Sequence, residues 1–191
     1  MNPVQRCPWP KSDLSIEYHD REWGVPIHDD RSLFEALVLG GAQAGLNWEI
    51  VLKKRDHYRA ACCDFDPLRV SRFGGTRIER MLKNPGLIRN RLKLESVVSN
   101  AKAFVIIQKE FGSFDSYLWR FVGEKPKVNR WQIIKEIPSR SPESDALSKD
   151  LQERGFKFVG PTIVYAVMQA VGMVNDHTLD CFRWSEVQIP R

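Results

Sequence analysis

The sequence predicts an all-α protein, and two observations carry this prediction. Stretches with apolar residues at helical spacing are repeatedly opened by a capping side chain or a proline and closed by a glycine. Convincing β-strand patterns do not accompany them. We therefore expect helices joined by short loops, in a single domain that covers residues 1–191.

The first predicted helices lie at 29–45 and 47–63. Aspartates suited to capping open the first, and Asn47 is a plausible N-cap for the second. A shorter helical segment follows at 66–75, where Pro67 takes a first helical position and glycines end the segment.

The second half of the chain contains one long predicted amphipathic helix at 89–112, with Gly112 at its C-terminal end. Two further helices are predicted at 141–155, from the N-cap Ser141 to Gly155, and at 161–172. The segment FKFVG joins these two helices.

This FKFVG connection has the form of a helix–hairpin–helix element within 141–172. Backbone N–H groups near Gly160, together with the charge of Lys157, could hold a DNA phosphate without reading sequence. The connection lacks the Gly-x-Gly of the commonest version, and many corners between two helices contain two glycines. From this segment alone, an ordinary helical corner and a nucleic-acid contact both remain open.

The composition is that of an ordinary globular protein, with 42% hydrophobic and 28% charged residues. The formal net charge of +5 permits binding to a polyanion without requiring it. No apolar run reaches the roughly 20 residues that a membrane helix needs, and the start of the chain does not resemble a signal peptide. We expect a cytoplasmic protein with no membrane association, whose cysteines are reduced, buried or metal-bound.

Two sets of residues could be functional or merely structural. His177 and Cys181 are four apart, which places both on one face of a helix, but a structural zinc ion needs four ligands. Cys7 and His19 could complete the set only if the two ends of the chain converge. Most of the six tryptophans are expected to pack in the core.

Three aromatic residues stand apart from this expectation, because Tyr18 and Trp23 lie among charged residues and Trp48 follows a Gly-Leu turn. Their rings could form the wall of a cleft for a flat base, and for a positively charged base in particular.

Several collinear stretches make the chain resemble the 3-methyladenine DNA glycosylase I (Tag) family. They are RCPW at 6–9, YHDREWGVP at 18–26, LFEALVLGGAQAGLNWEIVLKKRDHYR at 33–59, FDP at 65–67, IRNRLK at 88–93 and a long block at 137–177. The resemblance implies an all-α helix–hairpin–helix glycosylase fold that excises 3-methyladenine from double-stranded DNA and leaves the strand intact. It also implies a structural zinc ion that joins the two ends of the chain, held by Cys7, His19, His177 and Cys181.

The resemblance also assigns roles around the damaged base. Tyr18 and Trp48 would stack on it and Trp23 would line the pocket, while Leu46 would fill the gap that the extruded nucleotide leaves in the duplex. Methylation at N3 leaves the base cationic and its glycosidic bond weak, so that no general acid is needed. Asp176 lies where the wider superfamily has an assisting aspartate, although its neighbour His177 suggests a structural role.

The chain departs from the family at Gly40, which stands where the family has a glutamate that recognises the base. A smaller departure puts Ser15 where a pocket tyrosine is often found. We expect weakened or shifted specificity, unless Glu17 or Glu49 compensates. The alternatives are a non-catalytic damaged-DNA-binding module, which Gly40 favours, and a zinc-stabilised interaction domain; no protein partner is indicated.

Overall fold

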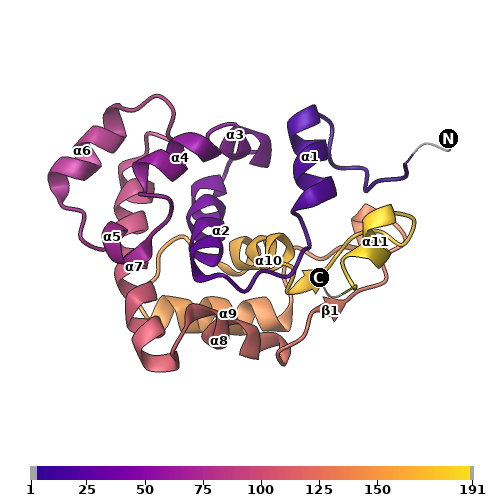
Figure 1. Ribbon diagram of the computed structural model, residues 1–191. Coiled ribbons are helices and arrows are strands. Elements are labelled where there is room, and N and C mark those ends of the chain that lie inside the picture. Colours follow the sequence, from indigo (N-terminus) through magenta and orange to yellow (C-terminus); the bar gives the residue numbers. More distant parts are fainter. Residues whose placement is uncertain (1–3, 190–191) are drawn as a thin grey trace.

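The computed structural model describes residues 4–189, and most of them lie in helices (Figure 1). The elements are α1 (Asp13–Arg21), α2 (Asp30–Gln43), α3 (Trp48–Leu52), α4 (Arg55–Ala61), α5 (Pro67–Val70), α6 (Gly75–Lys83), α7 (Arg91–Phe111), α8 (Phe114–Trp119), η1 (Arg120–Val122), β1 (Lys127–Val128), η2 (Ile134–Glu136), α9 (Pro142–Glu153), α10 (Pro161–Ala170), β2 (Val174–Asn175) and α11 (Phe182–Glu186). The predominance of helices confirms the predicted fold class. Among the described residues, no helix is both long and apolar enough to cross a membrane.

Local capping explains where most helices begin and end. The N-cap side chains that accept a hydrogen bond from the first turn belong to Ser12, Asp29, Asn47, Asp66, Asn90, Ser113 and Ser141. Pro67, Pro142 and Pro161 occupy first turns, where a missing N–H group costs nothing. Gly112 and Gly155 follow α7 and α9 with φ values of 85° and 90°, a conformation that favours glycine.

The prediction of one helix over 47–63 is wrong, because the chain forms α3 and α4 with a turn between them. At this turn the Lys54 N–H donates to the carbonyl of Val51, three residues back, and the helix does not continue. Helix α3 buries Val51 and Leu52, and α4 buries Tyr58. The Lys54 side chain donates to the carbonyl of Pro85, so a contact distant in the sequence is made where the two helices meet.

The glycines at the end of 66–75 also act differently from the prediction. Gly74 is the N-cap of α6, a helix that the sequence pattern did not reveal. A parallel pair of two-residue strands is a further departure, in which Lys127 pairs with Val174 and Val128 with Asn175. This pairing ties the segment before α9 to the segment after α10.

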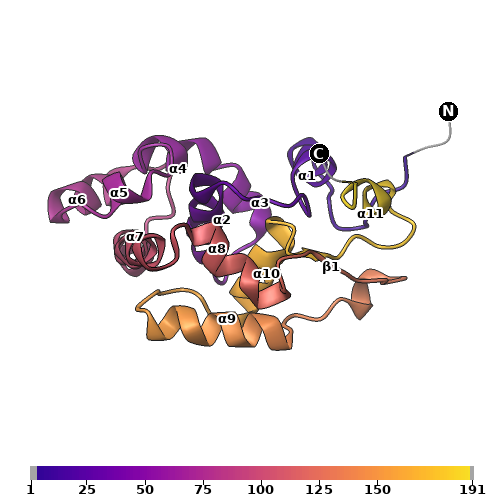
Figure 2. The same cartoon turned by 60° about the horizontal axis from the view of Figure 1, so that its bottom comes forward.

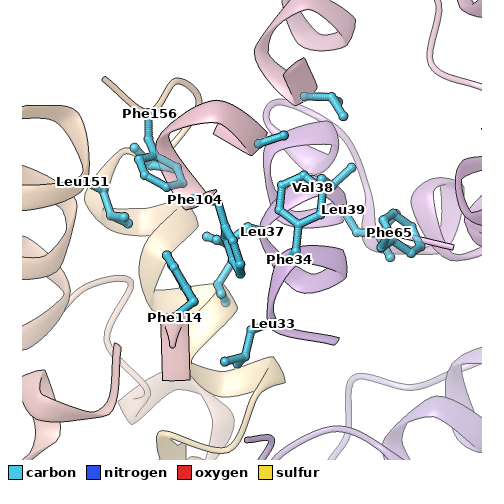
Figure 3. Packing of buried hydrophobic residues seen from close by; sticks show 14 of the residues in the cluster. Leu33, Phe34, Leu37, Val38, Leu39, Phe65, Phe104, Phe114, Leu151 and Phe156 are labelled. Carbon is cyan, nitrogen blue, oxygen red and sulfur yellow. The ribbon is translucent and has the colours of Figure 1, made fainter. Parts of the chain in front are cut away.

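The main core surrounds α2, which packs against α3, α7, α8 and α10, while α9 covers α10 on its other side (Figure 2). Leu33, Phe34 and Leu37 of α2 are buried, and the rings of Phe104 and Phe114 stack beside them with centroids 4.0 Å apart (Figure 3). Full burial of such side chains contributes roughly 1.5–3 kcal/mol each. This core fixes α2 and α10, the two helices that support the candidate site.

The segment before α1 runs beside α11 and the loop that leads into it (Figures 1 and 2). The N–H of Phe182 donates to the carbonyl of Gln5, and the Gln5 side chain donates to Asp180. A second, smaller buried cluster forms there from Cys7, Tyr18, Trp23, Leu52 and Cys181. The convergence that the metal hypothesis required is therefore present.

Candidate active site and metal centre

Four potential metal ligands meet in this second cluster. Cys7, His19, His177 and Cys181 are buried, and their ligand atoms all lie within 4.8 Å of one another. The Cys7 sulfur is 3.5 Å from His177 Nδ1, and the Cys181 sulfur is 3.5 Å from His19 Nε2 and 3.6 Å from His177 Nδ1. Bond lengths of about 2.3 Å to sulfur and 2.05 Å to nitrogen around a tetrahedral zinc ion place S and N about 3.6 Å apart. The donor set therefore fits one tetrahedral metal ion.

The remaining ring nitrogens of the two histidines have partners that orient them. His19 Nδ1 lies 2.8 Å from Asp20 Oδ1, and His177 Nε2 lies 3.0 Å from the carbonyl oxygen of Trp23. Such outer partners hold an imidazole in the tautomer and orientation that a metal ion needs. Gly24 permits the close approach, because a Cβ at this position would come within 2.9 Å of His177 Nε2.

The two thiols of the cluster differ in acidity. Hydrogen bonding with Cys7 and then with the two histidines lowers the pKa of Cys181, although burial opposes the shift. The hydrogen bond with Cys181, and then burial, raise the pKa of Cys7. The arrangement therefore holds one thiolate readily, and a divalent cation would stabilise the second thiolate as well.

A cavity of about 480 Å³ adjoins the cluster. Tyr18, Trp23 and Trp48, the three aromatic residues singled out in the sequence, all line it, and Trp9 joins them. The Tyr18 and Trp48 rings lie 5.3 Å apart with an interplanar angle of 49°, and the Trp9 and Trp23 rings lie 5.2 Å apart, edge to face. A planar ligand can therefore contact aromatic faces in this cavity.

The metal cluster positions part of the aromatic wall. Tyr18 is adjacent to His19 on α1, and the carbonyl of Trp23 contacts His177. The N–H of Gly24 also donates to the carbonyl of Gln169 on α10. Loss of the cluster would free these attachments, so its effect would extend to the cavity.

One face of α2 forms another wall of the cavity. Its lining residues are Ser32, Glu35, Ala36, Leu39, Gly40 and Gln43, which recur at the three- and four-residue spacing of a single helix face. Gly40 contributes only backbone, and Val167 of α10 packs directly over it. A Cβ built at Gly40 would lie 2.6 Å from Val167 Cγ2. A side chain at position 40 therefore requires α10 or Val167 to move.

The charged residues that line the cavity form one ion-paired group. Arg55 Nε donates to Glu35 Oε1 at 2.6 Å, and Arg55 Nη1 donates to Glu22 at 2.9 Å. Burial opposes charge on Arg55, but its bonds to Glu35 and Glu22 prevail and raise its pKa. Two carboxylates and one guanidinium give this lining a formal charge of −1.

Glu17, Glu49 and Ser15 do not line the cavity. Glu17 pairs with Arg21 at 3.2 Å, and Glu49 accepts a hydrogen bond from Ser12 at 2.7 Å. Ser15 is buried in the capping box at the start of α1. None of the three is placed to replace a side chain missing at position 40.

The sequence-predicted DNA-binding residues lie on two turns. Leu46, 38% exposed, projects from the turn between α2 and α3, while Lys157 and Gly160 lie in the connection between α9 and α10, where Gly160 is the N-cap of α10. A Cβ at Gly41, near the end of α2, would lie 3.4 Å from Cβ of Phe158 in that connection. The two turns are therefore packed close to each other.

Two buried polar side chains of α7 hold these turns. Lys93 Nζ donates to the carbonyls of Ala42 at 2.8 Å and Ala44 at 2.6 Å, at the C-terminal end of α2. Asn100 bonds both the N–H and the carbonyl of Lys157, at 2.8 and 3.0 Å. A seven-residue spacing is about two helical turns, so both side chains lie on one side of α7. The helix thus fixes both turns to one rigid support.

Asp176 is fully engaged in structural hydrogen bonds. Its two oxygens accept from Asn129 and Trp131, both at 2.7 Å, and from Tyr165 at 2.7 Å and Gln169 at 2.8 Å. Four donors around one buried carboxylate tie the segment after β1 to α10. This geometry supports the structural role that its sequence position suggested.

Sequence reasoning did not single out several cavity residues, namely Trp9, Glu22, Glu35, Arg55, Val167 and Gln169. The helical spacing of the α2 stripe could have indicated Glu35, because it lies four residues before Leu39 on the same face. Val167 carried no such signal, since its contact with Gly40 joins helices far apart in the chain.

Proteins of known family resemble this chain in sequence. The family model for methyladenine glycosylase matches residues 9–184. DNA-3-methyladenine glycosylase 1 of Escherichia coli (strain K12) is 46% identical over 179 residues, which cover 93% of this chain and 96% of that protein. DNA-3-methyladenine glycosylase of Haemophilus influenzae (strain ATCC 51907 / DSM 11121 / KW20 / Rd) is 46% identical over 177 residues, or 92% and 96% of the two chains.

Solved structures agree as well. A crystal structure of 3-methyladenine DNA glycosylase I (TAG) superposes with a TM-score of 0.91 at 48% identity, covering 93% of this chain and 98% of that chain. The Staphylococcus aureus enzyme, whose structure addresses 3-methyladenine recognition, superposes with a TM-score of 0.89 at 34% identity, covering 95% and 94%. This chain belongs to the methyladenine glycosylase family.

Proposed function

We propose that the protein is a DNA glycosylase that hydrolyses the N-glycosidic bond of 3-methyladenine in double-stranded DNA. The observation that carries the proposal is the cavity itself, which combines aromatic walls with a lining of formal charge −1. Such a cavity suits a flat cation, which an N3-methylated adenine is while it remains attached to DNA. Relatives named for the same activity support the assignment.

The departing base does not need a proton from a side chain. The cationic base leaves as a neutral molecule, and the positive charge passes to the sugar before water attacks there. The residues must hold the extruded base against the rings of Tyr18 and Trp48, with Trp23 lining the pocket, and exclude bulk water. No lysine is found among the described residues that line the cavity, so no amine is at hand to form a covalent sugar adduct and cut the strand. The proposed activity is therefore monofunctional.

Duplex binding is assigned to the two turns held by α7. Leu46 would fill the gap left in the base stack, while Lys157 and the N–H groups at the start of α10, next to Gly160, would hold a phosphate. In this proposal the α9–α10 pair acts as the helix–hairpin–helix element of a single domain covering residues 1–191. These contacts are to the backbone and to the gap, so they carry little sequence preference.

The metal cluster is assigned a structural zinc ion. Cys7, His19, His177 and Cys181 would hold it, and the bound ion would supply folding energy and no chemistry at the base. The cluster joins the two terminal segments of the chain. His177 contacts the carbonyl of Trp23, and His19 directly follows Tyr18 on α1. The zinc ion would thus keep the aromatic wall in place. The cytoplasmic location stays a prediction.

Gly40 gives one reason to consider a non-catalytic alternative. If the family glutamate recognises the base, its absence here weakens or shifts specificity, and a damaged-DNA-binding module on the same scaffold would tolerate that loss. Incubation with N-methylated duplex DNA, followed by chromatography of the released bases, decides between them. We expect release of 3-methyladenine without strand cleavage, whereas tight binding of the methylated duplex with no released base would favour the module.

A further inference from the structure

The cavity and the whole chain differ in the sign of their charge. The chain carries a formal charge of +5, which suits the DNA backbone, while the charged groups that line the cavity sum to −1. Position 40 contributes no side chain to this negative lining, and Glu17 and Glu49 are bound elsewhere. The negative charge in the cavity comes from Glu22 and Glu35.

The two carboxylates differ in how free they are to bind a ligand. The side chain of Glu22 is 43% exposed, and both of its oxygens lie within 2.9 Å of Arg55 Nη1. The side chain of Glu35 is only 13% exposed, and one oxygen, Oε1, accepts from Arg55 at 2.6 Å and from Arg59 at 3.2 Å. Within residues 4–189, no donor bonds the other oxygen of Glu35. The Glu35 carboxylate is therefore oriented through Oε1 and retains a free acceptor at Oε2.

The position of Glu35 relative to the aromatic pair also suits a role in recognition. It projects from the α2 face that lines the cavity, one helical turn before Leu39. The rings of Tyr18 and Trp48, which are assigned to stack on the base, line the same cavity. A carboxylate in this place can accept an N–H group from the edge of a stacked base.

We propose that Glu35, held by Arg55 and Arg59, is the acceptor that recognises the positively charged base in this protein. The inference rests on the proposed function and names the residue that gives the site its preference for a cation. Glu35 thereby supplies the carboxylate that position 40 lacks.

The test compares a charged and a neutral purine on the same folded proteins. The probes are 3,9-dimethyladeninium, which carries a fixed positive charge, and neutral 9-methyladenine, each titrated while tryptophan fluorescence is followed. The variant Glu35→Gln keeps the shape of the side chain and removes its charge. Glu17→Gln is the matched control, because it makes the same charge change on α1 outside the cavity.

We expect Glu35→Gln to weaken binding of the cation by about 10- to 150-fold, the range of a hydrogen bond to a charged group. Binding of 9-methyladenine should weaken by a clearly smaller factor, because its amino group donates to Glu35 without a positive charge on the base. Glu17→Gln should change neither. Equal losses for both probes would overturn the inference, because they would show that Glu35 only maintains the shape of the cavity. Unchanged affinity for the cation would overturn it as well.

Two further measurements keep the result interpretable. If Glu35→Gln does not fold, Glu35→Asp, which keeps the charge and shortens the reach, must still lower affinity for the cation more than affinity for 9-methyladenine. Release of 3-methyladenine from methylated DNA by the unmodified protein tests the proposed function separately. Normal release by both the unmodified protein and Glu35→Gln would refute the role of Glu35 and leave the proposed function standing.

Discussion

The contact between Gly40 and Val167 predicts that a side chain at position 40 destabilises the protein unless Val167 is shortened. A Cβ at Gly40 would come within 2.6 Å of Val167 Cγ2, a separation that packed carbon atoms do not tolerate. The side chain of Val167 is stiff because it is β-branched and lies within α10. The clash must therefore be relieved by moving a helix or leaving a rotamer minimum.

The magnitude can be worked out for Gly40→Ala. Overpacking a core costs about 1–3 kcal/mol, while replacing glycine by alanine within a helix returns roughly 0.5–1 kcal/mol. The net loss is about 0–2.5 kcal/mol, or a fall of up to about 10 °C in Tm for a chain of this size. Val167→Ala alone removes two methyl groups, which costs about 1.6 kcal/mol or more.

Thermal unfolding of the two single variants and the double variant tests this reasoning. We expect the double variant to be about 0.5–3 kcal/mol more stable than the sum of the single changes predicts, because the clash is absent from it. Additive effects, or a Gly40→Ala protein that is more stable than the unmodified one, would refute the packing argument. On this account Gly40→Glu gains base release only when it is combined with Val167→Ala.

Three further predictions concern the metal ion, DNA binding and the support that Lys93 gives to the turn that carries Leu46. Purified protein should contain one tightly held zinc ion per chain, and Cys7→Ala or His177→Ala should reduce the free energy of unfolding by more than it reduces the free energy of base binding. Absence of zinc, with stability unaffected by a chelator, would contradict this. Affinity for duplex DNA should fall steeply with salt, and Lys157→Ala should reduce it for all sequences alike, so an affinity that stays flat with salt would count against the phosphate contacts. Lys93→Met should slow base release from duplex DNA while sparing binding of the free base, and it should add little to Leu46→Ala, whereas additive effects would show that Lys93 does not act through that turn.

The sequence revealed those parts of the fold that depend on local signals. Ser141 with Pro142 and Gly155 correctly bounded α9, and Gly112 correctly marked the end of α7. The turn at Lys54 was missed, because no glycine or proline marks it in the sequence. A continuous helical pattern runs through this position, and tertiary contacts overrode that pattern.

The candidate site divides in the same way. Residue type and family resemblance were enough to name Cys7 and Cys181, and the structure brings them together from opposite ends of the chain. Spacing along α2 could have placed Glu35 on the cavity face, but its pairing with Arg55 and the packing of Val167 over Gly40 could not be read from spacing. Both depend on how α2, α4 and α10 pack, which joins residues that are distant in sequence.

The rate of 3-methyladenine release under single-turnover conditions shows whether base excision takes place in the aromatic cavity. The unmodified protein and Trp48→Ala are compared on the same N-methylated duplex, after their folding and zinc content have been matched. Stacking of a base on an aromatic side chain is worth about 1–3 kcal/mol, so we predict release by the unmodified protein and a rate about 5- to 150-fold lower for Trp48→Ala. Equal rates for the two proteins, or no release by either while both bind the duplex, would contradict the account.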